Sequence, residues 1–474
     1  MARVAFIQFT MIDNLGPMIL CAELKKHGHD TEIIIAPEEP NYAQRLRDKP
    51  PDIFAFSCTT GTHLIALREI ESLRSEFPDS MMLMGGPHPT YFPEIVNEDG
   101  LDVICRGDGE EAMVELADAV QDGSDFSGIE NLWVKRDGEV TKNALRPLNQ
   151  DLDGIAFPDR EFYHRYKSVR IYPSKLFIAS RGCPFDCSFC FNHSLKALYA
   201  GKGSYVRHRS VGNVIEEIAR VKAKWKWLKT PYFADDSFLL NRKWTQEFCE
   251  LYRKEIGMPF LCQIRADLLD EELAETIKAG GCHLVSLGVE SGNDFLREKV
   301  LGKKITREQI ERAASILRKH KILFRTYNML CLPGETLDMA METVTLNSKI
   351  KVDCPWASIV QPYPRTQLGE YVVEHGFVGP DFDPTKMSAS FFKGSVFDLP
   401  EKREIENLQK LFYAAIKWHI PPSLVKRLVR LPKNPLFEAI FQATYLFNTA
   451  KAYRMPLWFT AWLGFQMRKL YTEN

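Results

Sequence analysis

Apolar runs alternate with helix-like stretches through the first 140 residues of the chain. Short apolar runs with few charges are typical of buried parallel strands, whereas apolar residues at every third or fourth position indicate a helix. The runs that we interpret as strands are Val4–Phe9, Glu32–Ile35, Ile53–Ser57, Met81–Met84 and Val103–Cys105. The helical stretches between them are Met18–His27, His63–Glu76 and Glu110–Val120. This alternation predicts a doubly wound parallel sheet of the flavodoxin or Rossmann-like type.

Ligands of a doubly wound sheet bind at the carboxyl ends of its strands. The segments that follow four of the predicted strands are rich in Gly, Ser, Thr or Pro: Thr10–Gly16, Ser57–Gly61, Gly85–Thr90 and Arg106–Glu110. We therefore expect a binding site at this edge. Further along, Asp137-Gly138 predicts a hairpin turn, and the weakly periodic residues 147–170 indicate a linker.

A second alternating series begins near Ser174. Its predicted strands are Leu176–Ser180, Tyr232–Asp235, Phe260–Arg265, Leu284–Val289, Leu323–Leu330 and Ser358–Pro362. Its predicted helices are Val211–Trp227, Lys243–Ile256, Asp270–Ala279, Arg307–His320 and Leu337–Ile350. A full eightfold barrel takes about 250 residues, so this shorter series predicts a partial (β/α)6 barrel with its catalytic groups at the carboxyl ends of the strands.

Residues beyond Pro400 lack clear strands and predict a mainly helical C-terminal region. Leu424–Arg430 and Met455–Lys469 combine apolar, aromatic and basic residues. Helices of this composition either pack on the barrel and cover the substrate cavity, which we favour, or lie in a membrane interface. We expect a first domain over residues 1–140, a linker over 141–173, the barrel over 174–370 and a helical domain over 371–474.

Composition and charge narrow the class of protein. The 474 residues are 45% hydrophobic and 26% charged, which is typical of a globular protein and excludes a disordered or multi-span membrane chain. A net charge of −1 provides no chain-wide basic field, so no nucleic-acid partner is expected. We see no signal peptide and no run of about 20 apolar residues. These features predict a cytoplasmic protein, with membrane association of the C-terminal region as the open alternative.

Three cysteines form a C-x3-C-x2-C pattern directly after the first predicted barrel strand: Cys183, Cys187 and Cys190. Thiolates are soft ligands that suit iron–sulfur clusters, and a loop this short brings three sulfurs to one cubane. The eight other cysteines are scattered, as is typical of free cysteines that pack as small hydrophobes, so one iron is left open for another ligand. The alternative is a structural zinc site completed by His193, because such a site takes four protein ligands.

With this motif, the segment from about Leu176 to Gln367 resembles the radical S-adenosylmethionine (SAM) superfamily. The resemblance implies that the cysteines hold a [4Fe–4S] cluster, that SAM chelates the open iron, and that one electron cleaves SAM to a 5′-deoxyadenosyl radical. Phe189 would pack near the adenine, and Leu332–Thr336 resembles the family's Gly-Leu-Pro-Gly-Glu-Thr, with Cys331 in place of the first Gly. The expected SAM pocket further contains residues at the carboxyl ends of the strands: Asp235, Asp236, Gln263, Arg265 and Glu290. Asp235-Asp236 stands where many relatives carry Gly-Gly-Glu. Each residue alone could have a structural role, but their common position favours function.

A doubly wound domain before this barrel resembles the cobalamin-binding branch of the superfamily, which includes methylases and anaerobic oxidative cyclases. Three runs carry the resemblance: residues 56–60, 85–90 and 106–111. Glycine lets a backbone approach a large ligand closely, and hydroxyls can bond its amide side chains. The implied cobalamin pocket contains Ser57, Thr59, Thr60, Gly85, Gly86, His88, Pro89, Thr90, Gly107 and Glu110.

The Asp-x-His-x-x-Gly motif of other cobalamin proteins is missing, so the resemblance implies no cobalt-binding histidine from that motif. The alternative is a domain that has lost cobalamin and serves as a scaffold. We expect His88, between two prolines, to shape its loop, and His63 to be an ordinary residue on the polar face of its helix.

The resemblance implies an enzyme, a cobalamin-dependent methyltransferase that acts on an unactivated carbon or phosphorus of a small or hydrophobic metabolite. Its electron donor would be a flavodoxin or a ferredoxin. One alternative is an oxidative cyclase or ring-rearranging enzyme of the same branch without net methyl transfer. An alternative of another class is a zinc-bearing, non-catalytic binding protein.

Overall fold

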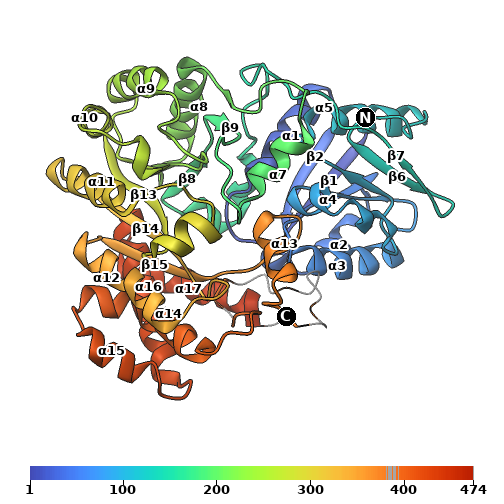
Figure 1. The fold of residues 1–474 in the computed structure, drawn as a ribbon. Coiled ribbons are helices and arrows are strands. Elements are labelled where there is room, and N and C mark those ends of the chain that lie inside the picture. Colours follow the sequence, from blue (N-terminus) through green and yellow to red (C-terminus); the bar gives the residue numbers. More distant parts are fainter. Residues whose placement is uncertain (380–381, 383–386, 388–390, 393, 473–474) are drawn as a thin grey trace. The chain divides into compact units, whose positions relative to one another are not determined.

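The computed structural model describes residues 1–379, 382, 387, 391–392 and 394–472, and side chains as far as residue 465. The described residues form two compact units (Figure 1). One contains residues 1–172 and 199–204, and the other contains residues 173–198, 205–379 and 394–472. The four-part division expected from the sequence stays a prediction.

The first unit is built on a seven-stranded sheet with the order β2-β1-β3-β4-β5-β6-β7. Its strands are β1 (Arg3–Gln8), β2 (Asp30–Ile35), β3 (Ile53–Ser57), β4 (Met81–Gly85), β5 (Val103–Cys105), β6 (Leu132–Arg136) and β7 (Glu139–Lys142). The first five strands pair in parallel, and β6 and β7 add an antiparallel hairpin. The order 2-1-3-4-5 is that of a flavodoxin-like sheet, so the predicted fold class is confirmed. Asp137 and Gly138 form the predicted turn, both with positive φ.

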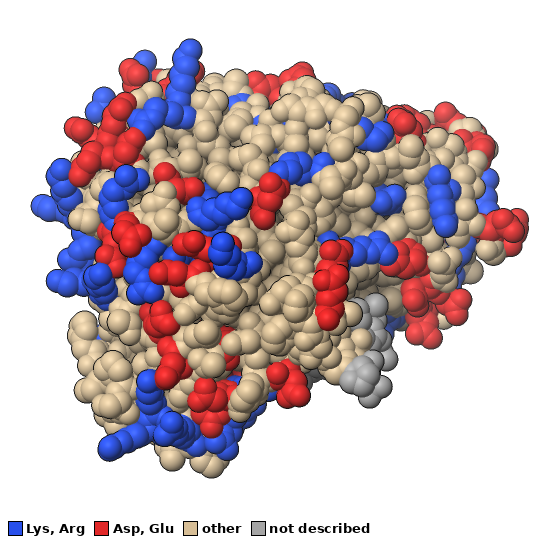
Figure 2. Space-filling model, viewed as in Figure 1, with Lys and Arg blue, Asp and Glu red and all other residues tan. Residues whose placement is uncertain are grey.

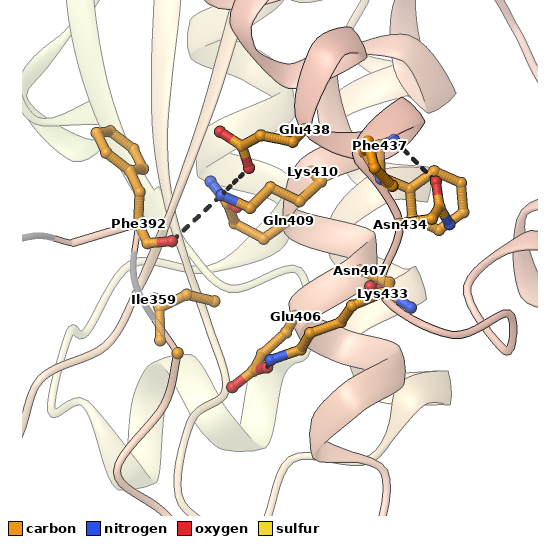
Figure 3. Close-up of a pocket in the computed structure, with 12 residues that line it drawn as sticks. Ile359, Phe392, Glu406, Asn407, Gln409, Lys410, Lys433, Asn434, Phe437 and Glu438 are labelled. Carbon is orange, nitrogen blue, oxygen red and sulfur yellow. Dashed lines mark hydrogen bonds and ion pairs between the residues drawn. The ribbon is translucent and has the colours of Figure 1, made fainter. Parts of the chain in front are cut away.

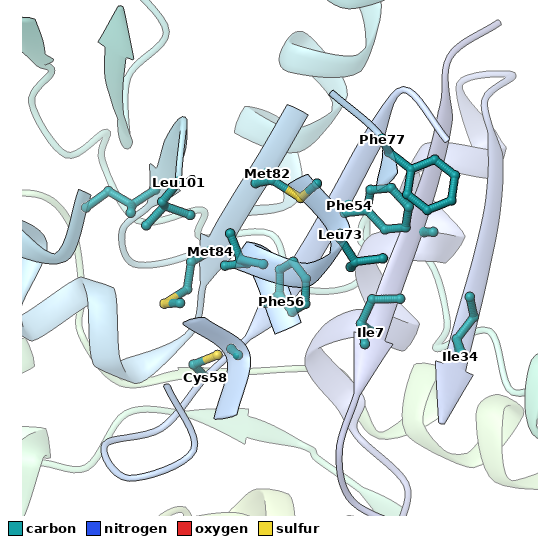
Figure 4. Packing of buried hydrophobic residues seen from close by; sticks show 14 of the residues in the cluster. Ile7, Ile34, Phe54, Phe56, Cys58, Leu73, Phe77, Met82, Met84 and Leu101 are labelled. Carbon is teal, nitrogen blue, oxygen red and sulfur yellow. The ribbon is translucent and has the colours of Figure 1, made fainter. Parts of the chain in front are cut away.

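Helices cover both faces of this sheet. They are α1 (Leu15–Lys26), α2 (Tyr42–Leu46), α3 (His63–Glu76), α4 (Pro87–Tyr91), α5 (Glu110–Asp122) and α6 (Lys167–Arg170). On one face, Phe54 packs on Phe77 with ring centroids 5.2 Å apart, and Phe56, Met82 and Met84 continue the same core (Figure 4). This continuous apolar packing explains why the strands appear in the sequence as nearly uninterrupted hydrophobic runs.

Residues 147–170, in which the sequence shows little periodicity, pack along the first unit. The Tyr163 hydroxyl donates to Gln8 Oε1 at 2.6 Å, and Arg160 forms a buried ion pair with Asp13 at 3.2 Å. The backbone N–H of Ile35 donates to the Tyr166 hydroxyl at 3.0 Å. Isolated polar contacts of this kind hold an irregular segment without producing a hydrophobic period.

The second unit contains an open six-stranded sheet with the order β15-β14-β13-β12-β11-β8. Its strands are β8 (Ser174–Phe177), β11 (Thr230–Phe233), β12 (Phe260–Ile264), β13 (Cys282–Glu290), β14 (Leu323–Leu330) and β15 (Cys354–Ile359). All neighbours pair in parallel, as a partial barrel requires. The short strands β9 (Ser180–Arg181) and β10 (Arg207–His208) form a separate antiparallel pair.

For two barrel strands, the bounds predicted from the sequence lie several residues further along the chain than those in the structure. β8 ends at Phe177 rather than Ser180, because the Ala179 N–H and the Ser180 hydroxyl bond to the Asp235 carboxylate. β15 spans Cys354–Ile359 rather than Ser358–Pro362, because Val352, Cys354 and Ile359 belong to the buried core.

The helices of the second unit are α7 (Phe191–Leu198), α8 (Val211–Lys224), α9 (Arg242–Glu255), α10 (Glu271–Ala279), α11 (Arg307–Lys319), α12 (Leu337–Lys349), α13 (Gln367–Glu374), α14 (Lys402–Lys417), α15 (Pro422–Leu428), α16 (Pro435–Tyr453) and α17 (Leu457–Thr472). On the convex side of the sheet, Phe233 packs against Phe248 of α9 with ring centroids 5.1 Å apart. On the concave side, Leu261, Leu284 and Cys354 pack against Ala452 of α16.

The C-terminal helices cover the free edge of β15. Its outward-facing carbonyls at Pro355 and Ala357 accept hydrogen bonds from the amide groups of Asn448 (2.8 Å) and Gln409 (3.1 Å). An exposed strand edge is a template for aggregation, and these two amides remove it. Lysine and arginine side chains gather over α15 at the lower left of Figure 2. Among the helices that the structure describes, none is long and apolar enough to cross a membrane.

Candidate functional site

The loop that carries the three cysteines is anchored by its central serine. The Ser188 N–H donates to the Leu301 carbonyl at 3.0 Å, and the Ser188 hydroxyl donates to the Val300 carbonyl at 2.7 Å. Gly182 starts the loop with φ of +87°, and a Cβ there would lie 2.3 Å from the Tyr205 carbonyl oxygen. The loop is therefore held in one conformation while all three cysteines stay partly exposed.

Nitrogen donors surround the sulfur atoms. The Asn192 N–H and side-chain amide lie 3.5 and 3.6 Å from Cys190 Sγ, and Arg265 Nη1 lies 3.8 Å from Cys187 Sγ. Burial, with smaller contributions from the nearby Asp236 and the other thiols, raises the pKa of the Cys183 thiol to about 11. Bare thiolates would repel one another here, so a positively charged iron centre with N–H donors to its sulfur ligands suits this loop.

A mononuclear zinc site does not fit the same residues. In the part of the chain that the structure describes, no three His, Cys, Asp or Glu side chains are placed to hold one metal ion. His193, the fourth ligand of the zinc alternative, places Nε2 3.1 Å from the Ser194 hydroxyl and leaves its buried Nδ1 without a hydrogen-bond partner. Three cysteines on one short loop are a ligand set typical of a cluster, whose cubane spreads its ligands over several irons.

The acidic pair after β11 supports the cysteine loop. Asp235 is buried, accepts from Ala179 N and from the Ser180 hydroxyl, and leaves Oδ2 without a hydrogen-bond partner. Burial raises the pKa of this carboxyl to about 6. Asp236 accepts from Asn192 Nδ2 at 2.9 Å, the amide that also approaches Cys190 Sγ. Asp235 thus bonds to the residues that precede the cysteine loop, and Asp236 bonds to Asn192, which contacts the last cysteine of the loop.

Three other residues expected in the SAM pocket, Gln263, Arg265 and Glu290, also lie at the carboxyl ends of the barrel strands, whereas Phe189 lies in the cysteine loop. Arg265 forms an ion pair with Asp267 at 3.0 Å, and Gln263 and Phe189 are partly exposed. Glu290 has φ of +61° and pairs with Lys303 at 2.7 Å. A Cβ on Gly288 would lie 2.3 Å from the Lys303 ammonium, so the glycine makes room for this ion pair.

Sequence reasoning missed Lys303 and Asn192. Lys303 lies in an irregular segment after the five-residue π-helix Leu296–Val300, and that position has no periodic signal. Asn192 lies two residues after Cys190, the last cysteine of the motif. This position beside the motif was the signal that could have identified it.

A cation lies lower on the concave side of the barrel. Arg325 on β14 is 4% exposed, its Nε lacks a hydrogen-bond partner, and Nη1 lies 3.4 Å from the Tyr327 hydroxyl. No carboxylate within the described ranges forms an ion pair with it. Burial by itself would raise the pKa of Tyr327, but Arg325 and the hydrogen bonds to the phenol lower it below the usual value.

The loops at the carboxyl edge of the first unit approach one another closely. Gly86 has φ of +91°, and a Cβ on it would lie 3.0 Å from both the N and the O of Cys58 and 3.1 Å from Ser57 Oγ. Cys58 N donates to the Gly85 carbonyl, and His88 N donates to the Cys58 carbonyl, each at 2.9 Å. Glycine at position 86 is therefore required for the loops after β3 and β4 to meet.

Thr90 joins these loops to the loop after β5. Its hydroxyl donates to the Gly86 carbonyl at 2.8 Å and accepts from the Gly107 N–H at 2.9 Å. Gly107 has φ of +71°, and a Cβ there would overlap the Tyr199 hydroxyl. That hydroxyl accepts from Asp108 N at 3.2 Å. Three of the four segments proposed as a binding edge thus form one hydrogen-bonded frame.

His63 and His88 stack with ring centroids 3.7 Å apart, and both are buried. The Thr60 hydroxyl lies 3.1 Å from His88 Nδ1, while Thr59 bonds within its own turn to Thr62. The expectation that His63 is a polar-face residue is wrong, because the ring packs inward over His88. Burial lowers the pKa of His63 to about 4, so its imidazole is neutral near pH 7.

The structure also contains two cavities, of which one is lined in part by a single residue expected in the cobalamin pocket. Glu110 lines a cavity of about 240 Å³ with Glu23 and Glu115, between α1 and α5. A cavity of about 420 Å³ lies where α14 and α16 meet the end of β15 (Figure 3). Its lysines are already paired, Lys410 with Glu438 at 3.1 Å and Lys433 with Glu406 at 2.5 Å. None of the residues predicted for the SAM or cluster site lines the larger cavity.

Comparison with known proteins agrees with the candidate site of each unit. Residues 177–346 match the model of the radical SAM superfamily, and residues 10–117 match the model of the B12 binding domain. The chain is 30% identical to an uncharacterised methyltransferase of Pyrococcus horikoshii over 380 residues, which cover 78% of this chain and 81% of that protein. The chain belongs to the cobalamin-binding radical SAM family.

This membership makes the protein a radical SAM enzyme and removes the alternative of a non-catalytic zinc protein. The chain is also 28% identical over 395 residues to the anaerobic magnesium-protoporphyrin IX monomethyl ester cyclase of Rubrivivax gelatinosus, covering 79% of this chain and 68% of the cyclase. The solved structure of the radical SAM methyltransferase TsrM from Kitasatospora setae, with cobalamin and a [4Fe–4S] cluster bound, has the same fold. Its TM-score is 0.68 at 17% identity over the whole of both chains.

Proposed function

We propose that this enzyme transfers a methyl group to an unactivated carbon or phosphorus of a small or hydrophobic metabolite, using a [4Fe–4S] cluster, SAM and cobalamin. The observation that carries the proposal is one chain with a nitrogen-lined thiol loop on a partial barrel and a glycine- and hydroxyl-rich edge on a doubly wound sheet. When bound, the cluster, SAM and cobalamin would supply a carbon-centred radical and a transferable methyl group.

The residues of the second unit divide into ligands and supports. Cys183, Cys187 and Cys190 hold the cluster, and Asn192 and Arg265 stabilise the negative charge on their sulfurs. Asp235 and Asp236 keep the flanks of the loop in place through Ser180 and Asn192. Phe189, Gln263 and Glu290 remain our candidates for contact with SAM, with Lys303 fixing the Glu290 carboxylate.

The residues of the first unit offer cobalamin a preformed edge. Gly85, Gly86 and Gly107 shape the loops, and Thr90 fastens them. Ser57, Thr59 and Thr60 present hydroxyls at the end of β3, and Pro89 and the buried His88 give the next loop its shape. Glu110 lies at the start of α5, where it also faces α1.

Metal analysis of the anaerobically reconstituted enzyme tests the cluster and cobalamin. We expect about four irons and four sulfides per chain and one bound hydroxocobalamin. Cys183→Ala, Cys187→Ala and Cys190→Ala each lose the iron, whereas the matched control Cys249→Ala, a buried cysteine on α9, retains it. Full iron content in the three loop variants would overturn the assignment.

Product mass tests the reaction. With SAM that carries a deuterated methyl group, a methylated product gains the mass of that group from SAM. Formation of 5′-deoxyadenosine with a product that carries no deuterium would instead support oxidative cyclisation or rearrangement. That second candidate is favoured by the similarity to the Rubrivivax gelatinosus cyclase.

The enzyme requires one electron at a time, and a flavodoxin or ferredoxin is the donor class that we propose. We also propose a reducing, cytoplasmic setting, because all of the cysteines in the chain are free thiols.

A further inference from the structure

The helical hairpin α16–α17 has an outward side that the fold leaves unused. Its inner side is committed, since Asn448 caps β15 and Ala452 enters the concave core. The outer side exposes large apolar groups: Phe447 at 53%, Trp458 at 73% and Phe465 at 60%. Large exposed apolar patches are rare on the surfaces of soluble proteins and usually mark a site that binds a partner.

The exposed positions follow helical periods, so they form stripes rather than scattered residues. On α16, Leu436, Ala443 and Phe447 precede the exposed basic residues Lys451 and Arg454. On α17, Trp458, Ala461 and Phe465 lie three or four residues apart on one side. The helices pack together, with a Cβ on Gly464 only 3.2 Å from Leu446.

The charge of this hairpin is one-sided. From the start of α16 to the end of α17 the sequence contains four basic residues, Lys451, Arg454, Arg468 and Lys469, and one acidic residue, Glu438, which pairs with Lys410 of α14 at 3.1 Å. Lys451 is partly neutralised by Asp353 at 3.0 Å, whereas Arg454 ends α16 in an exposed left-handed turn. Exposed tryptophan and phenylalanine on the same hairpin as the exposed Arg454 are features that bind an anionic bilayer surface.

We propose that the outer side of the α16–α17 hairpin docks on the surface of an anionic phospholipid bilayer. A second copy of this chain is a poorer occupant, because a two-fold contact through this side would bring together two hairpins that each carry a net positive charge. Lipid phosphates supply the missing negative charge, and the interface accommodates the aromatic rings. The inference does not depend on the reaction that the enzyme catalyses.

Vesicle flotation of the full-length, cluster-loaded protein tests the proposal. We expect binding to vesicles that mix phosphatidylglycerol with phosphatidylcholine, weaker binding to phosphatidylcholine alone, and release by high salt. The double variant Trp458→Ser and Phe465→Ser should bind at least about tenfold more weakly, because each ring loses its apolar burial. Arg454→Gln should lower binding to the anionic vesicles about fivefold.

Trp227→Ser is the matched control. Trp227 is 58% exposed in the connection between α8 and β11, outside the hairpin, so its replacement should leave vesicle binding unchanged. Unchanged thermal unfolding of all variants confirms that the fold persists.

Two outcomes would overturn the proposal. One is wild-type protein that does not float, or that floats equally with neutral and anionic vesicles. The other is a wild-type dimer in light scattering that the Trp458→Ser and Phe465→Ser variant converts to a monomer, which would make this side a subunit interface.

Discussion

The guanidinium of Arg265 lies 3.4 Å from the centroid of the Phe185 ring, inside the loop of the three cysteines. The stack aims Nη1 at Cys187 Sγ, and Asp267 holds the opposite side of the same group. The residue directly after β12 thus ties the barrel to the cluster loop and places a positive charge beside a sulfur ligand.

Replacing Arg265 with Gln should weaken the cluster. Loss of the cation destabilises the more negative, reduced cluster, so its reduction potential should fall, and activity or cluster retention should drop about tenfold or more. Redox titration followed by electron paramagnetic resonance measures the potential. Arg242→Gln serves as the control, because the Arg242 side chain is exposed at the start of α9. An unchanged potential in the Arg265 variant would show that the charge does not act on the cluster.

A methyl group on Gly86 should disrupt the edge of the first unit. Gly86→Ala forces a side chain into φ of +91° and into contact with the Cys58 backbone, and such strained conformations cost about 1–3 kcal/mol before any clash. Gly138→Ala is the matched control, because Gly138 has φ of +81° but nothing within 4 Å of the added Cβ. Urea unfolding should rank Gly86→Ala as the more destabilised variant. Equal losses would mean that the close approach of the loops is not tight.

Thr90→Val should loosen the frame that we assign to cobalamin. The change keeps the shape of the side chain but leaves the Gly107 N–H and the Gly86 carbonyl without their shared hydroxyl, at a cost of about 1–3 kcal/mol. Titration with hydroxocobalamin, followed by absorbance, should show weaker binding. Thr90→Ser retains the hydroxyl and should bind nearly as the wild type does. Tight binding by the valine variant would remove this frame from the site.

The sequence predicts the sheets better than the site. The doubly wound sheet and the barrel could be predicted because their strands are covered on both faces. Such strands appear in the sequence as continuous hydrophobic runs. The loop cysteines are equally visible, because their spacing is itself the chemistry. Lys303 and the His63–His88 stack were not visible, since each depends on a partner distant in the chain or on an inward turn of one side chain. Asp235 shows the same limit, because its bonds to Ala179 and Ser180 shorten a strand that hydrophobicity alone would extend.

Glu335 should make the stability of the enzyme fall as the pH rises. This carboxyl is buried after β14, accepts from Leu332 N at 3.0 Å, and burial raises its pKa to about 8. The native state therefore holds a proton that the unfolded chain releases near pH 4.5, and stability declines between about pH 4.5 and 8. Glu335→Gln keeps the acceptor oxygen and removes the ionisation, so the variant should lose this decline. Unfolding in urea at several pH values measures it, with the exposed Glu216→Gln as control. Parallel pH profiles for wild type and Glu335→Gln would contradict the prediction.

Tyr327 should ionise before the other tyrosines of the barrel. The buried Arg325 lacks a carboxylate partner among the described residues, so a phenolate at Tyr327, whose hydroxyl lies 3.4 Å from Arg325 Nη1, compensates its charge. A pH titration of the phenolate absorbance should therefore show an early step, below the usual tyrosine value, that disappears in Tyr327→Phe. Tyr363→Phe is the control, since burial raises the pKa of Tyr363 to about 12 and its loss should leave the early step intact. Arg325→Met should also abolish the step. An early step that persists without Tyr327 would assign it to another phenol, and the concave side would then hold an uncompensated cation.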